Sequence, residues 1–523
     1  MKRGVVRVVI ATLILALVVG VTGCAESGNT PPVAVYVSAN QVVVFWDPSD
    51  SFSNEIIMMN NVYETLLRYD PEANKLTPVL ATGYKTSDDG LTWTFDIRKG
   101  VKFHTGNELT ADAVKASIER TIKRGNGASF IWAPVKDIKV LDPYKIEFDL
   151  SYAAPLDLIV ASGYGAHIFD PKAVQQNGED WFSQGHEAGT GPYQLDSFKG
   201  KEEVVLKKFD QYWGGWKGKH FDKVVFQEVS EAATRAQMVQ AGQADFVDNL
   251  PIEQIERLKS DPKVTITQVP SYQNLLGLFN TKKPPLDNKL VRQALSYAVP
   301  YDQIIQDIMK GYATQAKGPV PKGLWGHDDS LPQYKLDLDK AKDLLKQAGY
   351  PNGGFKLLLT YASGDEIERQ IAELTKASFA KLNVNLEIRG MPWEPQWDLG
   401  KATKPKDRQD IFVMYWWPDY TTPYSFLYNM FHSEDKVNFN LAYYNNADYD
   451  KLIDDGQKIS GANRQKAVDL FGQAQKMLVD DAASLYFFDQ MYVRAIRSDF
   501  QGYKDNPSYP HVVFFYDTHR GSK

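Results

Sequence analysis

Segments with the two-residue period of β-strands alternate along this chain with segments that have the period of an α-helix. Residues 92–97 (TWTFDI) place Trp93, Phe95 and Ile97 on one face, and residues 145–150 (KIEFDL) repeat that pattern. Amphipathic helices are expected where apolar residues recur every three or four positions. Further strands are expected at 203–209, 223–229 and 264–269, and helices at 110–122, 339–349 and 463–481. The pattern predicts a mixed α/β fold.

The chain is too long for one ordinary hydrophobic core. With 523 residues, two or more lobes are expected. A hydrophobic content of 43% and a charged content of 24% are typical of a soluble globular protein. Boundary signals occur in the Pro-rich stretch 280–288 (NTKKPPLDN) and in the strand-like stretch 484–494. Two lobes joined by two crossings would place their hinges there.

The first 24 residues have the layout of a secretory signal. A basic start is followed by 14 uncharged apolar residues, Val8–Val21, and then by Cys24. A retained membrane helix is the alternative, but the run is shorter than the roughly 20 residues that span a bilayer. Cys24 is the only cysteine, and Val21–Cys24 (VTGC) resembles the lipobox of bacterial lipoproteins. The resemblance implies that Cys24 becomes the first mature residue and carries lipid.

The charge of the mature chain argues against polyanionic partners. Cleavage before Cys24 removes three cations, Lys2, Arg3 and Arg7, and no acid, so the net charge changes from −6 to −9. Nucleic acid is therefore not expected as a partner. The only membrane contact expected is through the lipid anchor.

Residues 414–427 (MYWWPDYTTPYSFL) set one charged residue, Asp419, among several aromatic rings. Three explanations are open. Asp419 could cap a turn before Pro423, it could be a catalytic acid, or it could grip a cation in a pocket whose rings stack on the rest of a ligand.

Several long blocks closely resemble the family 5 extracellular solute-binding proteins, which serve oligopeptide, dipeptide, nickel and some oligosaccharide ABC importers. The most specific block is LTWTFDIRKGVKFHTGNELTADAVKASIER at 91–120. The others, in chain order, lie at 60–70, 189–215, 233–251, 275–305 and 337–351. The resemblance covers nearly the whole mature chain.

The resemblance implies a two-lobed periplasmic-binding-protein clamp of type II, with an extra subdomain in the first lobe. It would bind its ligand between the lobes and hand it to an ABC permease and ATPase, as a monomer without a cofactor. The implied parts are a signal peptide at 1–23, a lipid-anchored linker at 24–32, lobe I at 33–277 (extra subdomain about 65–190) completed by 490–523, and lobe II at 281–486. The location would be the outer face of the cell membrane or the periplasm.

The same resemblance implies the site. In peptide-binding members, a Trp-x-x-Asp-Tyr-x-x-Pro block supplies the Asp that pairs with the ligand's α-ammonium group, and it matches Trp416, Asp419, Tyr420 and Pro423. The remaining expected ligand contacts are Trp417, Trp393, Tyr272, Asn274 and Trp132. No cation matches the position that would hold a peptide carboxylate; Arg408, Lys404 and Arg389 lie in the region without a fitting pattern.

Three functions follow from these residues. The main prediction is capture of oligopeptides for import, without catalysis. An oligosaccharide could replace the peptide, with its sugar faces stacked on Trp416, Trp417 and Trp393. The alternative of another class is a secreted glycoside hydrolase, which also uses carboxylates in an aromatic cleft. No metal site is expected, because the 8 His residues are scattered and show no ligand spacing.

Overall fold

The computed structural model describes residues 32–39, 42–43, 46–200 and 202–521. The part from Pro32 to Lys523 forms one compact unit. Strands and helices alternate through it, which confirms the predicted mixed α/β class. The predicted signal peptide, Cys24 and nearly all of the linker lie outside the described residues.

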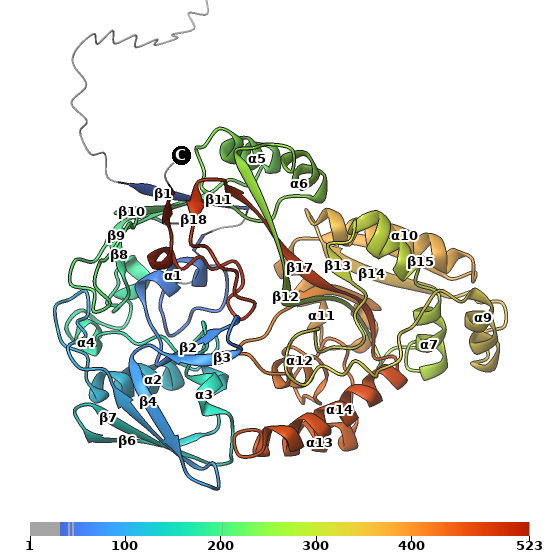
Figure 1. The fold of residues 1–523 in the computed structure, drawn as a ribbon. Helices are drawn as coiled ribbons and strands as arrows, with labels where there is room; N and C mark the ends of the chain where they lie inside the picture. The colour runs from blue at the N-terminus through green and yellow to red at the C-terminus, as the bar shows by residue number, and fades with distance from the viewer. Residues whose placement is uncertain (1–31, 40–41, 44–45, 201, 522–523) are drawn as a thin grey trace, which may run out of the picture. The chain divides into compact units, whose positions relative to one another are not determined.

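A large mixed sheet runs through this unit (Figure 1). Its strands lie in the order β15-β14-β16-β12-β17-β11-β1-β10-β9-β8, and β13 pairs with β17 at one side. In chain order they are β1 (Val33–Ser38), β8 (Tyr193–Lys199), β9 (Glu203–Lys208), β10 (Lys223–Glu228), β11 (Phe246–Val247), β12 (Val264–Phe279), β13 (Ala313–Thr314), β14 (Lys356–Ala362), β15 (Asn385–Met391), β16 (Ile411–Trp416) and β17 (Ser484–Arg497).

The two longest strands, β12 and β17, form the antiparallel centre of the sheet (Figure 1). Their pairing loses register between Pro270 and Asn274. Before this shift, β12 pairs only with β17, which continues to β11; after it, β12 also pairs with β16. The sheet therefore has two halves that share a pair of strands. The proposed lobe limits at 277–281 and 486–490 fall within or just after these strands and remain a prediction.

A separate four-stranded sheet has the order β4-β5-β7-β6. The predicted strands 92–97 and 145–150 are β5 (Thr92–Ile97) and β7 (Lys145–Leu150), and they are paired neighbours flanked by β4 (Ala81–Thr86) and β6 (Val135–Asp142). Trp93, Phe95 and Ile97 are buried as the alternation predicts. Helix α2 (Ala111–Arg124) packs against β6, and Thr110 is its N-cap residue, although its side chain makes no capping hydrogen bond.

The other predicted helices are also present. Helix α9 (Leu338–Gln347) begins after Asp337, whose side chain accepts from the amide of Lys340, and α14 (Arg464–Asp480) begins after Asn463, which caps the amide of Lys466. The remaining α-helices are α1 (Ile56–Val62), α3 (Leu156–Ile159), α4 (Pro171–Asn177), α5 (Ala232–Gln240), α6 (Ile252–Leu258), α7 (Lys289–Tyr297), α8 (Tyr301–Gln303), α10 (Glu366–Ala380), α11 (Trp393–Gly400), α12 (Tyr424–Phe431) and α13 (Ala447–Ile459). Two small hairpin pairs, β2 (Leu67–Asp70) with β3 (Lys75–Pro78) and β18 (Phe500–Gln501) with β19 (His519–Arg520), complete the strands.

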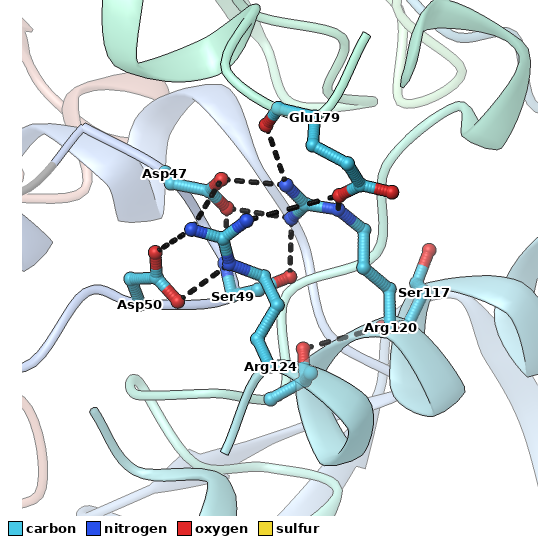
Figure 2. A network of polar contacts seen from close by, with 8 residues as sticks. Asp47, Ser49, Asp50, Ser117, Arg120, Arg124 and Glu179 are labelled. Carbon is cyan, nitrogen blue, oxygen red and sulfur yellow. Dashed lines mark hydrogen bonds and ion pairs between the residues drawn. The ribbon is translucent and has the colours of Figure 1, made fainter. Parts of the chain in front are cut away.

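A buried ion network ties the loop after β1 to helix α2 (Figure 2). Arg120 donates through both terminal nitrogens to the two carboxylate oxygens of Asp47, each at 2.7 Å, and its Nε reaches Glu179 at 3.1 Å. Arg124 pairs with Asp50 one turn further along α2. Side-chain exposures of 2% for Asp47 and 9% for Arg120 place the central pair out of water, where both charges need partners.

Candidate ligand-binding site

Asp419 lies three residues beyond the end of β16 and is buried, with 5% of its surface exposed. Its Oδ2 accepts from the Ser425 hydroxyl at 2.6 Å and from the Asn429 amide at 2.8 Å, both on α12. Its backbone carbonyl accepts from Ser162 at 2.7 Å, a residue 257 positions earlier in the chain. The carboxylate is therefore oriented by neutral donors of one helix, while the backbone is held by a distant segment.

No cation neutralises Asp419 within the part of the chain that the structure describes. Among the described residues, the side chains that bond its carboxylate are the neutral Ser425 and Asn429, both through Oδ2. Burial raises the pKa of Asp419 from 3.8 to about 6, although the Ser425 and Asn429 bonds oppose this. A buried carboxylate without a counter-ion is stabilised when a positive group binds next to it.

An aromatic cluster extends from the block that contains Asp419, with Phe439 at its centre. The Phe439 ring lies 5.8 Å from Trp416, 5.9 Å from Trp397 and 6.3 Å from both Phe52 and Phe130, measured between ring centroids. The cluster therefore joins five residues that lie in separate stretches of the sequence. Such a set of rings suits stacking on flat or apolar ligand groups as well as packing.

Trp393 and Trp417 belong to the same neighbourhood. Trp393 packs on Trp397 at 5.3 Å and keeps 48% of its surface exposed, so it is the most accessible ring of the group. Trp417 is half-buried, and its indole N–H donates to the Tyr164 hydroxyl at 3.2 Å. Tyr164 in turn packs edge-on against Phe52 at 5.6 Å. These contacts connect the Asp419 block with the segment around residue 164.

The other predicted site residues are held by internal bonds. The Tyr420 hydroxyl accepts from Gln457 at 3.1 Å, and the Tyr272 hydroxyl lies 3.2 Å from that of Tyr69. Asn274 pairs with Trp416 across β12 and β16. The indole N–H of Trp132 is bound to the Gly165 carbonyl at 2.8 Å, and its ring stacks on Phe148 of the four-stranded sheet. Trp132 is thus packed against the four-stranded sheet, and its contact with a ligand stays a prediction.

Sequence patterns did not single out Phe439, Phe52, Ser425 or Asn429. Phe439 and Phe52 lie in irregular segments far from the Asp419 block, so no period connects them to it. Ser425 and Asn429 carry a usable signal, because they are four residues apart on α12 and therefore on one helical face. A search for polar residues at that spacing after the Asp would have found them.

The cations considered for a ligand carboxylate are engaged elsewhere or stand apart. Arg408 is buried over the Tyr443 ring and donates to the Ala402 carbonyl at 2.6 Å, and Arg389 pairs with Glu387 at 2.8 Å. Lys404 is exposed before a short turn of 3-10 helix. Lys401, which the sequence did not single out, lies 5.0 Å from the Trp397 ring centroid, and burial lowers its pKa. It is the cation that contacts the aromatic cluster.

Two cavities lie away from these residues. One of about 410 Å³ is lined by Arg68, Asp70, Tyr503, Asp505 and neighbouring residues, and one of about 240 Å³ is lined by Asn61, Glu64, Trp213, Tyr516 and others. Neither includes Asp419 or a member of the aromatic cluster. Among the residues described, no three His, Cys, Asp or Glu side chains are grouped to hold a metal ion. The helices in the described ranges are too short or too polar to cross a membrane.

Comparison with known proteins agrees with this architecture. Residues 75–438 match the model of the bacterial extracellular solute-binding proteins, family 5. The chain is 30% identical over 455 residues to a probable D,D-dipeptide-binding periplasmic protein of Escherichia coli, covering 85% of this chain and 86% of that protein. It is 29% identical over 473 residues to heme-binding protein A of Haemophilus influenzae, covering 85% of each chain.

A solved structure extends the similarity to the fold. The ABC transporter-associated periplasmic binding protein DppA from Helicobacter pylori, in complex with the peptide STSA, superposes with a TM-score of 0.81 at 25% identity, covering 93% of this chain and 98% of that one. The predicted two-lobed type II binding-protein fold is thereby confirmed. Over most of its length, therefore, this chain belongs to the bacterial extracellular solute-binding proteins of family 5.

Proposed function

We propose that this protein is the ligand-capturing component of an ABC importer and that its cargo is oligopeptides, bound between two lobes. The observation that carries the peptide assignment is Asp419, a buried carboxylate oriented by Ser425 and Asn429 and without a cationic partner among the described residues. The names of two similar proteins support it, one a dipeptide-binding protein and one a complex with a peptide.

In this proposal the α-ammonium group of the peptide is the counter-ion that neutralises the Asp419 carboxylate. An ammonium group taken out of water needs a charged partner, and the bond between the two contributes about 1.5–3 kcal/mol net. The neighbouring rings of Trp416 and Trp417 would face the rest of the ligand. Lys401, above Trp397, supplies a cation for the opposite end of the peptide. The protein binds its cargo and does not transform it.

An oligosaccharide remains the second candidate cargo. The aromatic cluster around Phe439 favours it as much as it favours a peptide, because sugar faces stack on Trp rings. The third candidate function is a glycoside hydrolase, which needs two carboxylates about 5–10 Å apart across the scissile bond. Similarity to binding proteins over 85% of the chain favours capture over hydrolysis.

The test begins with the ligand. Small molecules released on denaturing the purified protein are identified by mass spectrometry, and each class found is titrated against the folded protein by thermal shift. A ligand that binds only the folded state raises the melting temperature by mass action. Peptides that raise it support the proposal; sugars that raise it while peptides do not would move the assignment to oligosaccharides.

The role of Asp419 is tested with a matched pair of ligands. A peptide with a free α-amino group should bind more tightly than its N-acetylated form. In Asp419→Asn, affinity for the free peptide should fall by roughly 2–5 kcal/mol, the usual effect of losing one member of a buried charged pair, while affinity for the acetylated peptide should change little. Equal losses for both ligands would assign Asp419 to the local turn instead.

We also propose that Cys24 carries the lipid that anchors the protein outside the cell, and that a separately encoded permease and ATPase complete the importer. Lipid chains anchor through burial of CH₂ groups at about 0.8 kcal/mol each, so two or more give stable attachment. Cys24→Ser should therefore appear in the soluble fraction. Retention of that variant in the membrane would mean that the apolar segment is not removed.

A further inference from the structure

Three polar side chains lie next to one another across the centre of the large sheet. Asn274 on β12 pairs with Trp416 on β16 and with Asp489 on β17, so the three residues form one row across three strands. Residues opposite each other in neighbouring strands point to the same face of a sheet. All three are buried, with exposures of 0% for Asn274, 8% for Trp416 and 6% for Asp489.

Each member of this row has a buried polar atom that finds no hydrogen-bond partner in the part of the chain that the structure describes. These atoms are Asn274 Oδ1, Trp416 Nε1 and Asp489 Oδ1. Buried polar groups are nearly always hydrogen-bonded, because an unmade bond costs about 1–3 kcal/mol. Three such atoms on paired residues of neighbouring strands, two acceptors and one donor, point to a place where a ligand supplies the missing bonds.

The other polar atoms of the row are fixed by one loop. The Asn274 amide nitrogen donates to the Pro319 carbonyl at 2.7 Å, and this bond determines that its oxygen is the free atom. The backbone amide of Lys322 donates to Asp489 Oδ2 at 3.0 Å. The loop therefore holds both side chains in place while one oxygen of each stays free.

Asp489 also lacks a counter-ion. Within the described ranges it forms no ion pair, and Lys322, whose side chain is exposed, offsets its burial only in part. Burial raises the pKa of Asp489 to about 7. A positive group bound here would restore the ionised form and remove the cost of the unpaired carboxylate.

We propose that Asp489 and Asn274 form a second subsite that accepts the basic side chain of a peptide, a Lys ammonium or an Arg guanidinium group, while Trp416 donates to a neighbouring ligand carbonyl. The proposal rests on peptide capture as proposed above. Trp416 and Asp419 are three residues apart, a span of at most about 10 Å, and Asp489 lies two strands from Trp416, about 10 Å further across the sheet. One peptide with a long basic side chain can therefore reach both carboxylates. Two acceptors on adjacent strands suit the forked donors of guanidinium especially well.

The test compares peptides that differ only in charge at one side chain. Isothermal titration of the full-length protein uses tripeptides that carry Arg, or its neutral isostere citrulline, at each position in turn. At one position the Arg peptide should bind at least about tenfold more tightly, as one charge-assisted hydrogen bond implies. In Asp489→Asn that preference should disappear, while affinity for the citrulline peptide stays within about twofold, a difference below about 0.5 kcal/mol.

The outcomes separate the two proposals. Equal binding of Arg and citrulline peptides by the natural protein at every position overturns the second subsite, and this comparison does not depend on the folding of any variant. A preference that survives in Asp489→Asn overturns the role of Asp489. If peptides bind through Asp419 and no preference for Arg exists, only the subsite is wrong; if no peptide binds, both proposals fall.

Discussion

Asp47 and Asp419 are both buried carboxylates, yet their surroundings differ in one respect. Both carboxylate oxygens of Asp47 accept hydrogen bonds from the Arg120 guanidinium group, each at 2.7 Å (Figure 2). The Asp419 carboxylate is bonded by no charged side chain of the described ranges, but by the neutral Ser425 and Asn429. The first carboxylate has its charge neutralised by the fold itself, and the second has its orientation fixed while its charge is left for a partner.

This difference separates groups that hold a structure from groups that await a ligand. Neutralised pairs stabilise only when both members are present, because removing one leaves the other stranded out of water. A lone buried carboxylate does the opposite: it reduces the stability of the free protein and becomes favourable when a cation binds. The predictions below test that contrast, from the largest effect to the smallest.

The largest effect is expected for the neutralised carboxylate. Asp47→Ala leaves the buried Arg120 with Glu179 and the neutral Ser49 hydroxyl as partners, and it should lower the free energy of unfolding by about 3–5 kcal/mol. Urea unfolding followed by circular dichroism measures this loss. Peptide affinity per folded molecule should stay unchanged. A variant as stable as the natural protein would show that the network in Figure 2 does not hold the fold.

Asp419→Asn should raise the free energy of unfolding of the ligand-free protein, the opposite of the effect of Asp47→Ala. The pKa of Asp419 is raised from 3.8 to about 6. A raised carboxyl pKa means that folding disfavours the ionised form, so the natural protein loses stability as pH rises from about 4 to 6. At about 1.36 kcal/mol per pKa unit, the neutral variant should be more stable by up to about 3 kcal/mol at pH 7.5. Urea unfolding without ligand measures it, and a large destabilisation would make Asp419 structural like Asp47.

His104 and Glu187 provide a second neutralised pair, with a dependence on pH. His104 Nδ1 lies 2.7 Å from Glu187 and its Nε2 lies 2.9 Å from the Gly191 carbonyl, so both ring nitrogens face acceptors, an arrangement that favours the protonated ring. The pKa of His104 is raised and that of Glu187 is lowered: burial opposes both shifts, and the attraction and hydrogen bond between the two outweigh it. His104→Gln should cost about 1.5–3 kcal/mol near pH 6.

The pH profile gives the sharper test of this pair. A raised His pKa contributes stability that is fully present below the unfolded value of about 6.5 and is lost as pH rises through the folded pKa. The lowered pKa of Glu187 contributes stability that is lost as pH falls through its own folded value. The difference in stability between natural protein and His104→Gln should therefore shrink above neutral pH. A difference that does not vary with pH would mean that the ring is neutral.

The smallest effect is expected where the Asp419 block touches Tyr164. Trp417→Phe removes the indole N–H that donates to the Tyr164 hydroxyl at 3.2 Å and keeps an aromatic ring. One neutral hydrogen bond contributes about 1 kcal/mol, so ligand affinity should fall by no more than about fivefold. Titration calorimetry resolves a change of this size. A loss beyond tenfold would mean that the ligand needs the indole ring of Trp417 itself and not only an aromatic face at this position.

The fold was predictable because its signals are local or recur in long blocks. The alternation in TWTFDI and KIEFDL correctly predicted two paired strands of the four-stranded sheet, and Asn463 correctly predicted the start of α14. The site was predictable only in part. The aromatic block pointed to Asp419, but nothing within it predicts that Phe439 would gather Trp397, Trp416 and Phe52, because those contacts arise from tertiary packing.

The role of Asp489 could not be predicted from its local sequence either. Its strand looks like any other buried strand of the sequence, and its importance depends on the register that places it beside Asn274. Cross-strand register is set by pairing over the whole sheet, and a slip of one residue would turn Asp489 to the opposite face. Information of that kind lies in the packed sheet and not in a single stretch of residues.

The lost register between Pro270 and Asn274 has a mechanical consequence. At this point the ladder of β12 and β17 is replaced by bonds of the Ser271 hydroxyl, which donates to the Gln490 carbonyl at 2.6 Å and accepts from the Gln273 amide at 3.1 Å. Strand β13 pairs with Gln490 and Asp489 at this point, and a second register shift follows between Leu275 and Leu276. Strands β12 and β17 are therefore less regularly paired here than before Pro270. The centre of the sheet therefore contains a short irregular segment where the two long strands can twist relative to each other, and Asn274 and Asp489 lie at its edge.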